Sequence, residues 1–109
     1  MEISITGRNF ELTAELKKYV SRKVSKFERF YSRIDRCEVI LEGEKIRRIA
    51  EVVVHLRRTR IVAKETTTDM YASVDNAVEV ITKQLRRVRG KVFSKRRKAV
   101  IDRFMGRGE

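Results

Sequence analysis

"IAEVVVHL", residues 49–56, decides the fold of this chain. The stretch is rich in β-branched residues, which favour strands. Apolar residues alternate with Glu51 and His55, so one face of the predicted strand is apolar and the other is polar. The residues that this alternation directs toward a core are Ala50, Val52, Val54 and Leu56.

Three shorter stretches on either side of the central strand are also predicted to be strands. In "RCEVILE", the alternation places Cys37, Val39 and Leu41 on one face. A turn at "GEK", residues 43–45, leads from this strand into the central one. The three additional strands are "EISIT" at 2–6, "RCEVILE" at 36–42 and "IVAKET" at 61–66.

Two amphipathic helices are predicted from apolar residues that recur every three or four positions. The first starts after Thr13 as its N-cap and runs for about five turns. The second starts after Thr68 or Asp69, and Gly90 either ends it or lies inside it as a weak helix former. The apolar stripes are Leu16, Val20, Val24, Phe27 and Tyr31 in the first helix, and Met70, Val74, Ala77, Val78, Ile81, Leu85 and Val88 in the second.

The predicted elements follow the order β-α-β-β-β-α. Each helix has one apolar stripe and each strand one apolar face, so we expect an α+β fold with both helices on one face of a four-stranded mixed sheet. The outline is similar to that of the double-stranded-RNA-binding module. We expect one domain at residues 1–93, followed by a basic C-terminal tail at 94–109.

Positive charge is unevenly distributed along the chain. The formal net charge is +12, of which residues 1–81 carry 16 − 13 = +3 and residues 82–109 carry 11 − 2 = +9. This asymmetry indicates a polyanionic partner, which is nucleic acid or an anionic membrane. The start of the chain lacks the basic and apolar pattern of a signal peptide, and no apolar run reaches the ~20 residues of a membrane span. We therefore expect a soluble, cytoplasmic protein.

The cations of the first predicted helix gather in one sector, opposite the apolar stripe. Like charges three or four positions apart cost roughly 0.2–0.5 kcal/mol per pair, so a helix that needed only solubility would alternate its signs. A merely solvated face remains the alternative. The residues of this sector are Lys18, Arg22, Lys26, Arg29 and Arg33.

The second predicted helix is also basic on its outer side. Lys83, Arg86 and Arg87 lie opposite its apolar stripe, and Arg89 and Lys91 flank the stripe. The helix dipole favours bases near a C-terminus, which is the alternative explanation, although its effect fades within the last turn. Both apolar stripes are needed to cover the sheet, so neither helix has a spare apolar face for a membrane. Nucleic acid is therefore the favoured partner.

Catalytic and cofactor patterns are weak in this sequence. His55 is the single histidine and has no nucleophile paired with it, while Cys37 is in phase with core residues. We find no ligand spacing typical of a metal site and no glycine-rich phosphate loop, so we expect no catalytic residues, no metal and no cofactor. A nuclease or RNA-modifying enzyme is kept as a third hypothesis, behind a ribosome-binding inhibitor and a general RNA- or DNA-binding protein.

Three stretches together resemble the ribosome hibernation-promoting factor family, also called ribosome-associated inhibitors. They are "TGRNFELT" at 6–13, "DMYASVDNAV" at 69–78 and "KQLRRVRGK" at 83–91, and the resemblance spans about residues 1–92. It implies a monomeric translation inhibitor that binds the small ribosomal subunit and its rRNA in the path of mRNA and tRNA, with which it competes. Long-form relatives add a C-terminal domain, so this sequence corresponds to a short form or to the N-terminal domain of a long one.

The resemblance also suggests individual RNA-binding residues. It carries over to Arg8, Arg22, Lys26, Arg86, Arg87 and Lys91 at matching positions. The pattern of charge on the predicted helices adds the other four. The complete predicted RNA-binding set is Arg8, Lys18, Arg22, Lys26, Arg29, Lys83, Arg86, Arg87, Arg89 and Lys91.

Overall fold

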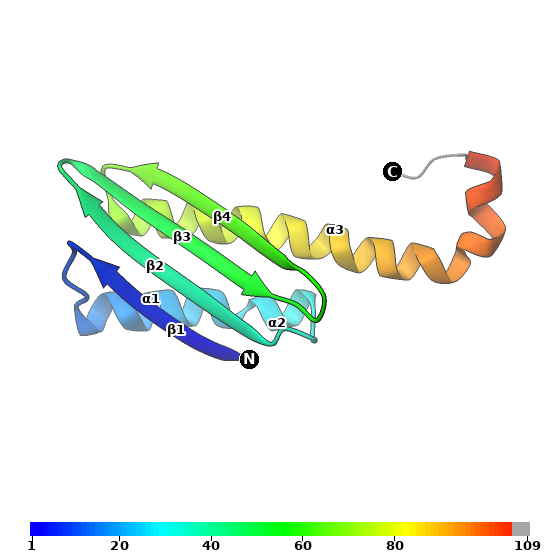
Figure 1. Ribbon diagram of the computed structural model, residues 1–109, viewed down its shortest axis with the longest axis horizontal. Helices are drawn as coiled ribbons and strands as arrows, with labels where there is room; N and C mark the ends of the chain where they lie inside the picture. Colours follow the sequence, from blue (N-terminus) through cyan, green and yellow to red (C-terminus); the bar gives the residue numbers. More distant parts are fainter. Residues whose placement is uncertain (106–109) are drawn as a thin grey trace.

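The protein forms one four-stranded sheet with its helices on one face, as the computed structural model shows (Figure 1). The structure describes the backbone of residues 1–105 and the side chains of residues 1–90. The predicted α+β class and the element order are confirmed, with one extra short helix after the first. The elements are β1 (Glu2–Arg8), α1 (Ala14–Ser25), α2 (Phe27–Phe30), β2 (Arg36–Glu44), β3 (Arg47–His55), β4 (Arg60–Thr67) and α3 (Met70–Met105).

The four strands lie in chain order across the sheet. β1 is parallel to β2, whereas β2–β3 and β3–β4 are antiparallel, so the sheet is mixed as predicted. The register places Val39 opposite Val52, and Val52 opposite Ala63. All three are buried, because side chains on this face pack beneath the helices. The predicted core face of the central strand is therefore confirmed, whereas Ile49 and Val53 on the opposite face are also buried.

The helices bury their apolar stripes against this face. Val20 and Val24 of α1, Phe27 of α2, and Ile81 and Leu85 of α3 are all fully buried in one cluster with the strand residues. The start of α3 is further tied to β3, because the buried Ser73 hydroxyl donates to the Arg48 carbonyl oxygen at 2.6 Å. One continuous core thus connects every element of the fold.

Both predicted helix starts are confirmed by hydrogen bonds. The Thr13 hydroxyl accepts from the Leu16 amide at 3.1 Å, and the Asp69 carboxylate accepts from the Tyr71 amide at 3.2 Å. Each bond satisfies an amide that has no partner within its own helix. Of the two candidates for the second cap, Asp69 is the one that caps α3.

The prediction of one long first helix is wrong. α1 ends at Ser25, and α2 is a separate helix of four residues. The Lys26 amide bonds to the carbonyl oxygens of Lys23 and Val24, which tightens the backbone between the two helices. Phe27 still follows Val24 by three residues, so the apolar stripe continues across the break and concealed it in the sequence.

One predicted boundary differs from the structure, and one question that the sequence left open is answered. The turn before β3 is Lys45–Ile46, slightly later than "GEK", and Lys45 has a φ of 58°. Gly90 does not end the second helix, since α3 continues to Met105. A β-carbon at Gly90 would have no neighbour within 4 Å, so its surroundings do not require a glycine. The division at residue 93 remains a prediction, and the helical backbone of α3 runs across it.

Replacing Phe27 with alanine tests the core. The side chain is fully buried where α2 meets the sheet, so Phe27→Ala should cost about 3–5 kcal/mol of unfolding free energy. Ile46→Ala is the matched control, because Ile46 is 74% exposed and its truncation should change stability by no more than about 0.5 kcal/mol. Denaturant titration measures both values, and equal midpoints for the two variants would contradict this core.

Candidate nucleic-acid interface

The basic side chains predicted to bind RNA lie mostly on the helix side of the molecule. α1 and α3 start at the same end of the sheet and run in the same direction (Figure 1). Their apolar sides face the sheet, so their polar sides form the outer surface of the helix layer. Of the predicted RNA-binding residues, those exposed in this layer, called the helix-layer cations below, are Lys18, Arg22, Lys26, Arg29, Lys83, Arg86, Arg87 and Arg89.

A cation–π contact connects the basic residues of α3 with those near α2. The Arg86 guanidinium lies 4.9 Å from the centroid of the Phe30 ring. Arg29 is the neighbour of Phe30 in α2, and Arg87 follows Arg86 in α3. The structure therefore brings cations far apart in the sequence to one part of the surface. The prediction that the five cations of the first predicted helix share one helix face is wrong, because Arg29 is in α2 and Arg33 is in the loop after it.

A second connection links α1 with α3. The Tyr19 hydroxyl donates to the Asp75 carboxylate at 2.5 Å, and the Lys23 ammonium lies 3.3 Å from the same oxygen. Arg22 and Lys23 also lie 5.4 and 5.6 Å from the centroid of the Tyr19 ring. This contact network holds two cations of α1 against the start of α3. Sequence reasoning missed it, since the partners are 56 residues apart and meet only in the folded chain.

The hydrogen bond in this network changes the acidity of Tyr19. The bond to Asp75 raises the pKa of Tyr19 to about 12, with further contributions from burial and from the negative charge of Asp75. The bond is made by the neutral phenol, so the folded protein favours that form. Tyr19 therefore remains a hydrogen-bond donor across the neutral pH range.

Two residues of the predicted RNA-binding set lie apart from this surface or are balanced within it, and a third is not described. Arg8 is at the end of β1, and its place in the alternation puts it on the sheet face without helices. Lys83 lies 3.7 Å from Glu79 on its own helix, which offsets part of its charge. The side chain of Lys91 lies outside the described residues.

The backbone around Arg8 is closely packed. A β-carbon on Gly7 would lie 2.6 Å from the Phe10 carbonyl oxygen, and one on Gly43 would lie 2.7 Å from the Asn9 carbonyl oxygen. Asn9 itself has a φ of 51°, which directs the chain back over the end of the sheet. The "TGRN" motif thus shapes the turn that leads into α1, and Arg8 is a part of that turn.

The two residues considered for chemistry have ordinary structural surroundings. His55 Nε2 lies 3.3 Å from the Glu38 carboxylate, and the neighbouring His55 and Arg36 side chains lower the pKa of Glu38. Burial raises the pKa of the Cys37 thiol to about 12, which opposes formation of a reactive thiolate. Among the described residues there is no cluster of three or more potential metal ligands. No helix in that part of the chain is long and apolar enough to span a membrane.

With this geometry established, comparison with known proteins identifies the family. The model of the Sigma 54 modulation protein / S30EA ribosomal protein family matches residues 3–92. The chain belongs to this family. The S30EA family includes curated relatives named ribosome hibernation promoting factor, so the resemblance drawn from the three sequence motifs is confirmed.

Curated members and solved structures of S30EA proteins are similar over most of this chain. The ribosome hibernation promoting factor of Salmonella typhimurium is 34% identical over 92 residues, which cover 84% of this chain and 97% of the relative. The Escherichia coli factor is 32% identical, with the same coverage of this chain and of the relative. The Thermus thermophilus Protein Y N-terminal domain has a TM-score of 0.74 at 29% identity, covering 81% of this chain and 99% of that one. A ribosomal subunit interface protein from Coxiella burnetii, with a TM-score of 0.77 at 23% identity, covers 83% and 99% and supports the fold alone.

The Tyr19–Asp75 bond predicts a late tyrosine titration. The folded-state pKa of Tyr19 is raised from 10.0 to about 12, so its stabilising effect is complete below pH ~10 and is lost as the pH rises toward ~12. Asp75→Asn should move this titration toward the ordinary value, because the charged acceptor is removed. Tyrosinate absorbance measures the change. Tyr31→Phe is the control and should keep the tyrosine titration near pH 12. If that titration survived in Tyr19→Phe, its assignment to Tyr19 would be wrong.

Proposed function

We propose that this protein is a ribosome hibernation factor that binds the small ribosomal subunit and occupies the path of mRNA and tRNA. Membership of the S30EA family and the names of its relatives support ribosome binding. The helix-layer cations support rRNA as the component contacted. By excluding mRNA and tRNA, the bound protein inhibits translation.

The observation that carries this proposal is the meeting of positive charges from separate helices. Arg86 of α3 lies over Phe30 of α2, and Lys23 of α1 reaches Asp75 of α3, so the basic sides of these helices form one surface. Phosphates along an RNA backbone are spaced closely enough to meet several such cations at once. Releasing their counterions supplies much of the binding free energy.

Binding without chemical turnover is part of the proposal. Cys37 is buried and its pKa is about 12, while His55 is next to Glu38 in the sheet. Neither residue has a nucleophile or an activating base in the arrangement that catalysis requires. Inhibition thus follows from occupancy alone, and we infer no catalytic residue.

A general RNA- or DNA-binding protein remains the second candidate, because positive charge also extends beyond the helix layer. Arg57, Arg58 and Arg60 are exposed at the turn between β3 and β4, and Lys64 is exposed on β4. If the total positive charge of the protein were enough for binding, any polyanion would bind and the position of the cations would matter little. The two candidates therefore differ in whether location or total charge determines affinity.

Replacing four helix-layer cations tests location. The variant Arg22→Gln, Lys26→Gln, Arg86→Gln and Arg87→Gln should abolish inhibition of translation. It should also flatten the slope of log affinity for the small subunit against log salt by about two to four units, at roughly 0.7–0.9 for each phosphate that is no longer neutralised. Removing the interaction between Arg86 and Phe30 should cost about 0.5–1 kcal/mol of stability, so the fold should survive. Sedimentation with purified subunits over a salt series provides the measurement.

The matched control removes the same formal charge elsewhere. Lys45, Arg47, Arg60 and Lys64 are exposed on the β2–β3 turn or on the sheet face without helices, and each is changed to glutamine. Arg48 is left intact because it donates to two backbone carbonyl oxygens. The control should keep most of the affinity and should still exclude tRNA. Equal losses in both variants would favour the general nucleic-acid-binding candidate.

We propose that the basic tail adds electrostatic affinity without choosing the site, and removing residues 94–109 tests this. The truncation deletes six cations, so affinity should fall and its salt dependence should weaken. Contacts with phosphates position a protein without reading sequence, so the shortened protein should protect the same rRNA positions at a higher concentration. Chemical probing of the subunit measures this. Protection that moved to other nucleotides at saturation would show that the tail selects the site.

A further inference from the structure

We propose that the hollow beside Tyr71 takes one unpaired RNA base, which stacks on the Tyr71 ring and donates from its amino group to the Glu15 carboxylate. The inference rests on the proposed function, because it names one specific contact within the RNA-binding region. It predicts a preference for bases with an exocyclic amino group, which are adenine, guanine and cytosine, over uracil.

Tyr71 is placed to offer its ring to a ligand. It is 37% exposed, one of three large hydrophobic residues in the described part of the chain with such exposure. Tyr19 meets it edge to face, with the ring centroids 4.8 Å apart and the planes at 73°. This contact fixes the ring while a part of its surface stays open. A fixed aromatic ring next to solvent is the element that proteins use to stack unpaired bases.

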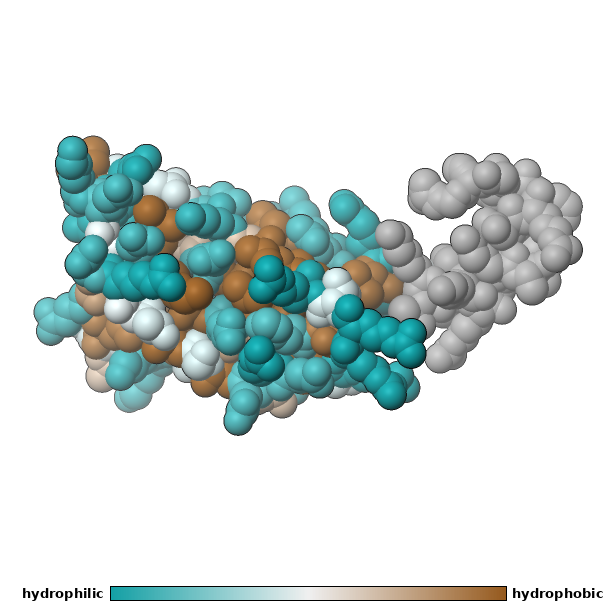
Figure 2. All heavy atoms as spheres, in the orientation of Figure 1, coloured by the Kyte–Doolittle hydropathy of each residue, from teal (hydrophilic) through white to brown (hydrophobic). Residues whose placement is uncertain are grey.

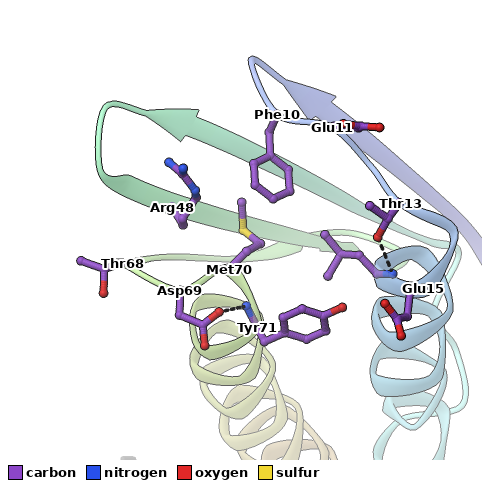
Figure 3. Close-up of a pocket in the computed structure, with 10 residues that line it drawn as sticks. Phe10, Glu11, Thr13, Glu15, Arg48, Thr68, Asp69, Met70 and Tyr71 are labelled. Atoms are coloured by element: carbon purple, nitrogen blue, oxygen red, sulfur yellow. Dashed lines mark hydrogen bonds between the residues drawn. The ribbon is translucent and has the colours of Figure 1, made fainter.

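A hollow of about 380 Å³ provides the space that a base needs next to this ring. It lies where α1 and α3 begin, and Figure 3 shows Tyr71 extending from the first turn of α3 toward Glu15 on α1. Phe10, Leu16 and Met70 contribute apolar walls. Apolar walls with a few polar groups are typical of pockets that hold a flat organic ring.

The charges around the hollow select a base rather than a phosphate. Glu11, Glu15 and Asp69 line it together with one cation, Arg48, so the three carboxylates outnumber the positive charge and disfavour an RNA phosphate. A carboxylate accepts hydrogen bonds from an amino group, as in the readout of cytosine by Glu or Asp. Asp69 already accepts from the Tyr71 amide, so Glu15 is the acceptor that we assign to the base.

In this proposal, the phosphate of the same nucleotide lies near two cations of α1. Arg22 and Lys23 are over the ring of Tyr19, which in turn contacts Tyr71. A nucleotide with its base on Tyr71 and its phosphate toward Arg22 thus meets an aromatic ring and a positive charge in sequence. Stacking and phosphate neutralisation have different salt dependences, so experiment can separate them.

Binding of short single-stranded oligo(C) and oligo(U) RNA to the full chain tests the stacking. Tyr71→Leu should weaken oligo(C) binding by roughly 5- to 150-fold without changing the salt slope, because it removes a stacked base and no charge. Tyr71→Phe should retain most of the affinity. Loss of affinity accompanied by a flatter salt slope, or no loss in a folded Tyr71→Leu protein, would overturn the proposal.

The preference between two pyrimidines of similar size tests Glu15. The wild-type protein should bind oligo(C) more tightly than oligo(U), and Glu15→Gln should remove that difference. Glu28→Gln is the matched control, since Glu28 is an exposed acid of α2 that does not line the hollow, and it should preserve the difference. Equal binding of the two RNAs by the wild-type protein would overturn the assignment to Glu15.

A tryptophan at position 71 reports the contact directly. The chain contains no tryptophan, so emission from a Tyr71→Trp variant comes from this position alone. Its emission should be quenched by oligo(C) and by the small subunit at matching occupancy, and unchanged emission at saturation would overturn the proposal. If oligo(C) quenches but no subunit binds, the proposed function fails while the base site stands. If the subunit binds equally to wild-type and Tyr71→Leu proteins, the base site alone fails.

Discussion

The structure depends on one constraint, which is that one face of the sheet holds the main apolar core and must be covered. Val52 and Val54 of β3 both point to that face, together with their neighbours on β2 and β4. Burial of such side chains is the main favourable contribution to folding. No single helix is wide enough to cover four strands, so α1 with α2 and α3 must lie next to each other. The side-by-side placement of two basic helix surfaces is therefore a consequence of covering the core.

Parallel alignment of the helices adds an electrostatic consequence. α1 and α3 begin at the same end, so the positive ends of their dipoles lie together and their negative ends point the same way. Glu15 and Asp69 occupy the starts of these helices, while Arg22, Arg86 and Arg87 lie farther along. The dipole explains the acids at the starts, but it acts only near helix ends and cannot hold a long run of exposed cations together. The contacts of Lys23 with Asp75 and of Arg86 with Phe30 offset part of that repulsion.

Most of the fold could be predicted from the sequence because apolar residues recur clearly at both the strand spacing and the helix spacing. The period of two in residues 49–56 identified the core face of β3, and stripes with a period near 3.6 identified the helices. The break at Lys26 could not be predicted, since it preserves the apolar stripe, and the sequence left open whether the second helix ended at Gly90 or passed through it. The basic character of the site was visible as charge, but contacts such as Tyr19–Asp75 depend on side chains brought together only by the tertiary structure. Tyr71 was visible within the "DMY" motif, yet its exposure depends on how α3 meets α1.

The two faces of the molecule differ in how their charges are arranged. On the sheet face without helices, the register puts Arg36 next to His55 and Glu51 next to Lys64, with Val53 and Val62 between these rows. Figure 2 views this face and shows apolar patches among hydrophilic residues. Cations there have acids nearby, as in the 3.3 Å contact between Arg36 and Glu38, so little positive field remains to attract RNA. The helix layer instead has more exposed cations than acids along α1, α2 and α3, and three of its acids, Glu11, Glu15 and Asp69, line the hollow near Tyr71. The proposed RNA-binding surface therefore lies on the helix side, and the hollow proposed to take a base lies at the start of the helices, where carboxylates outnumber cations.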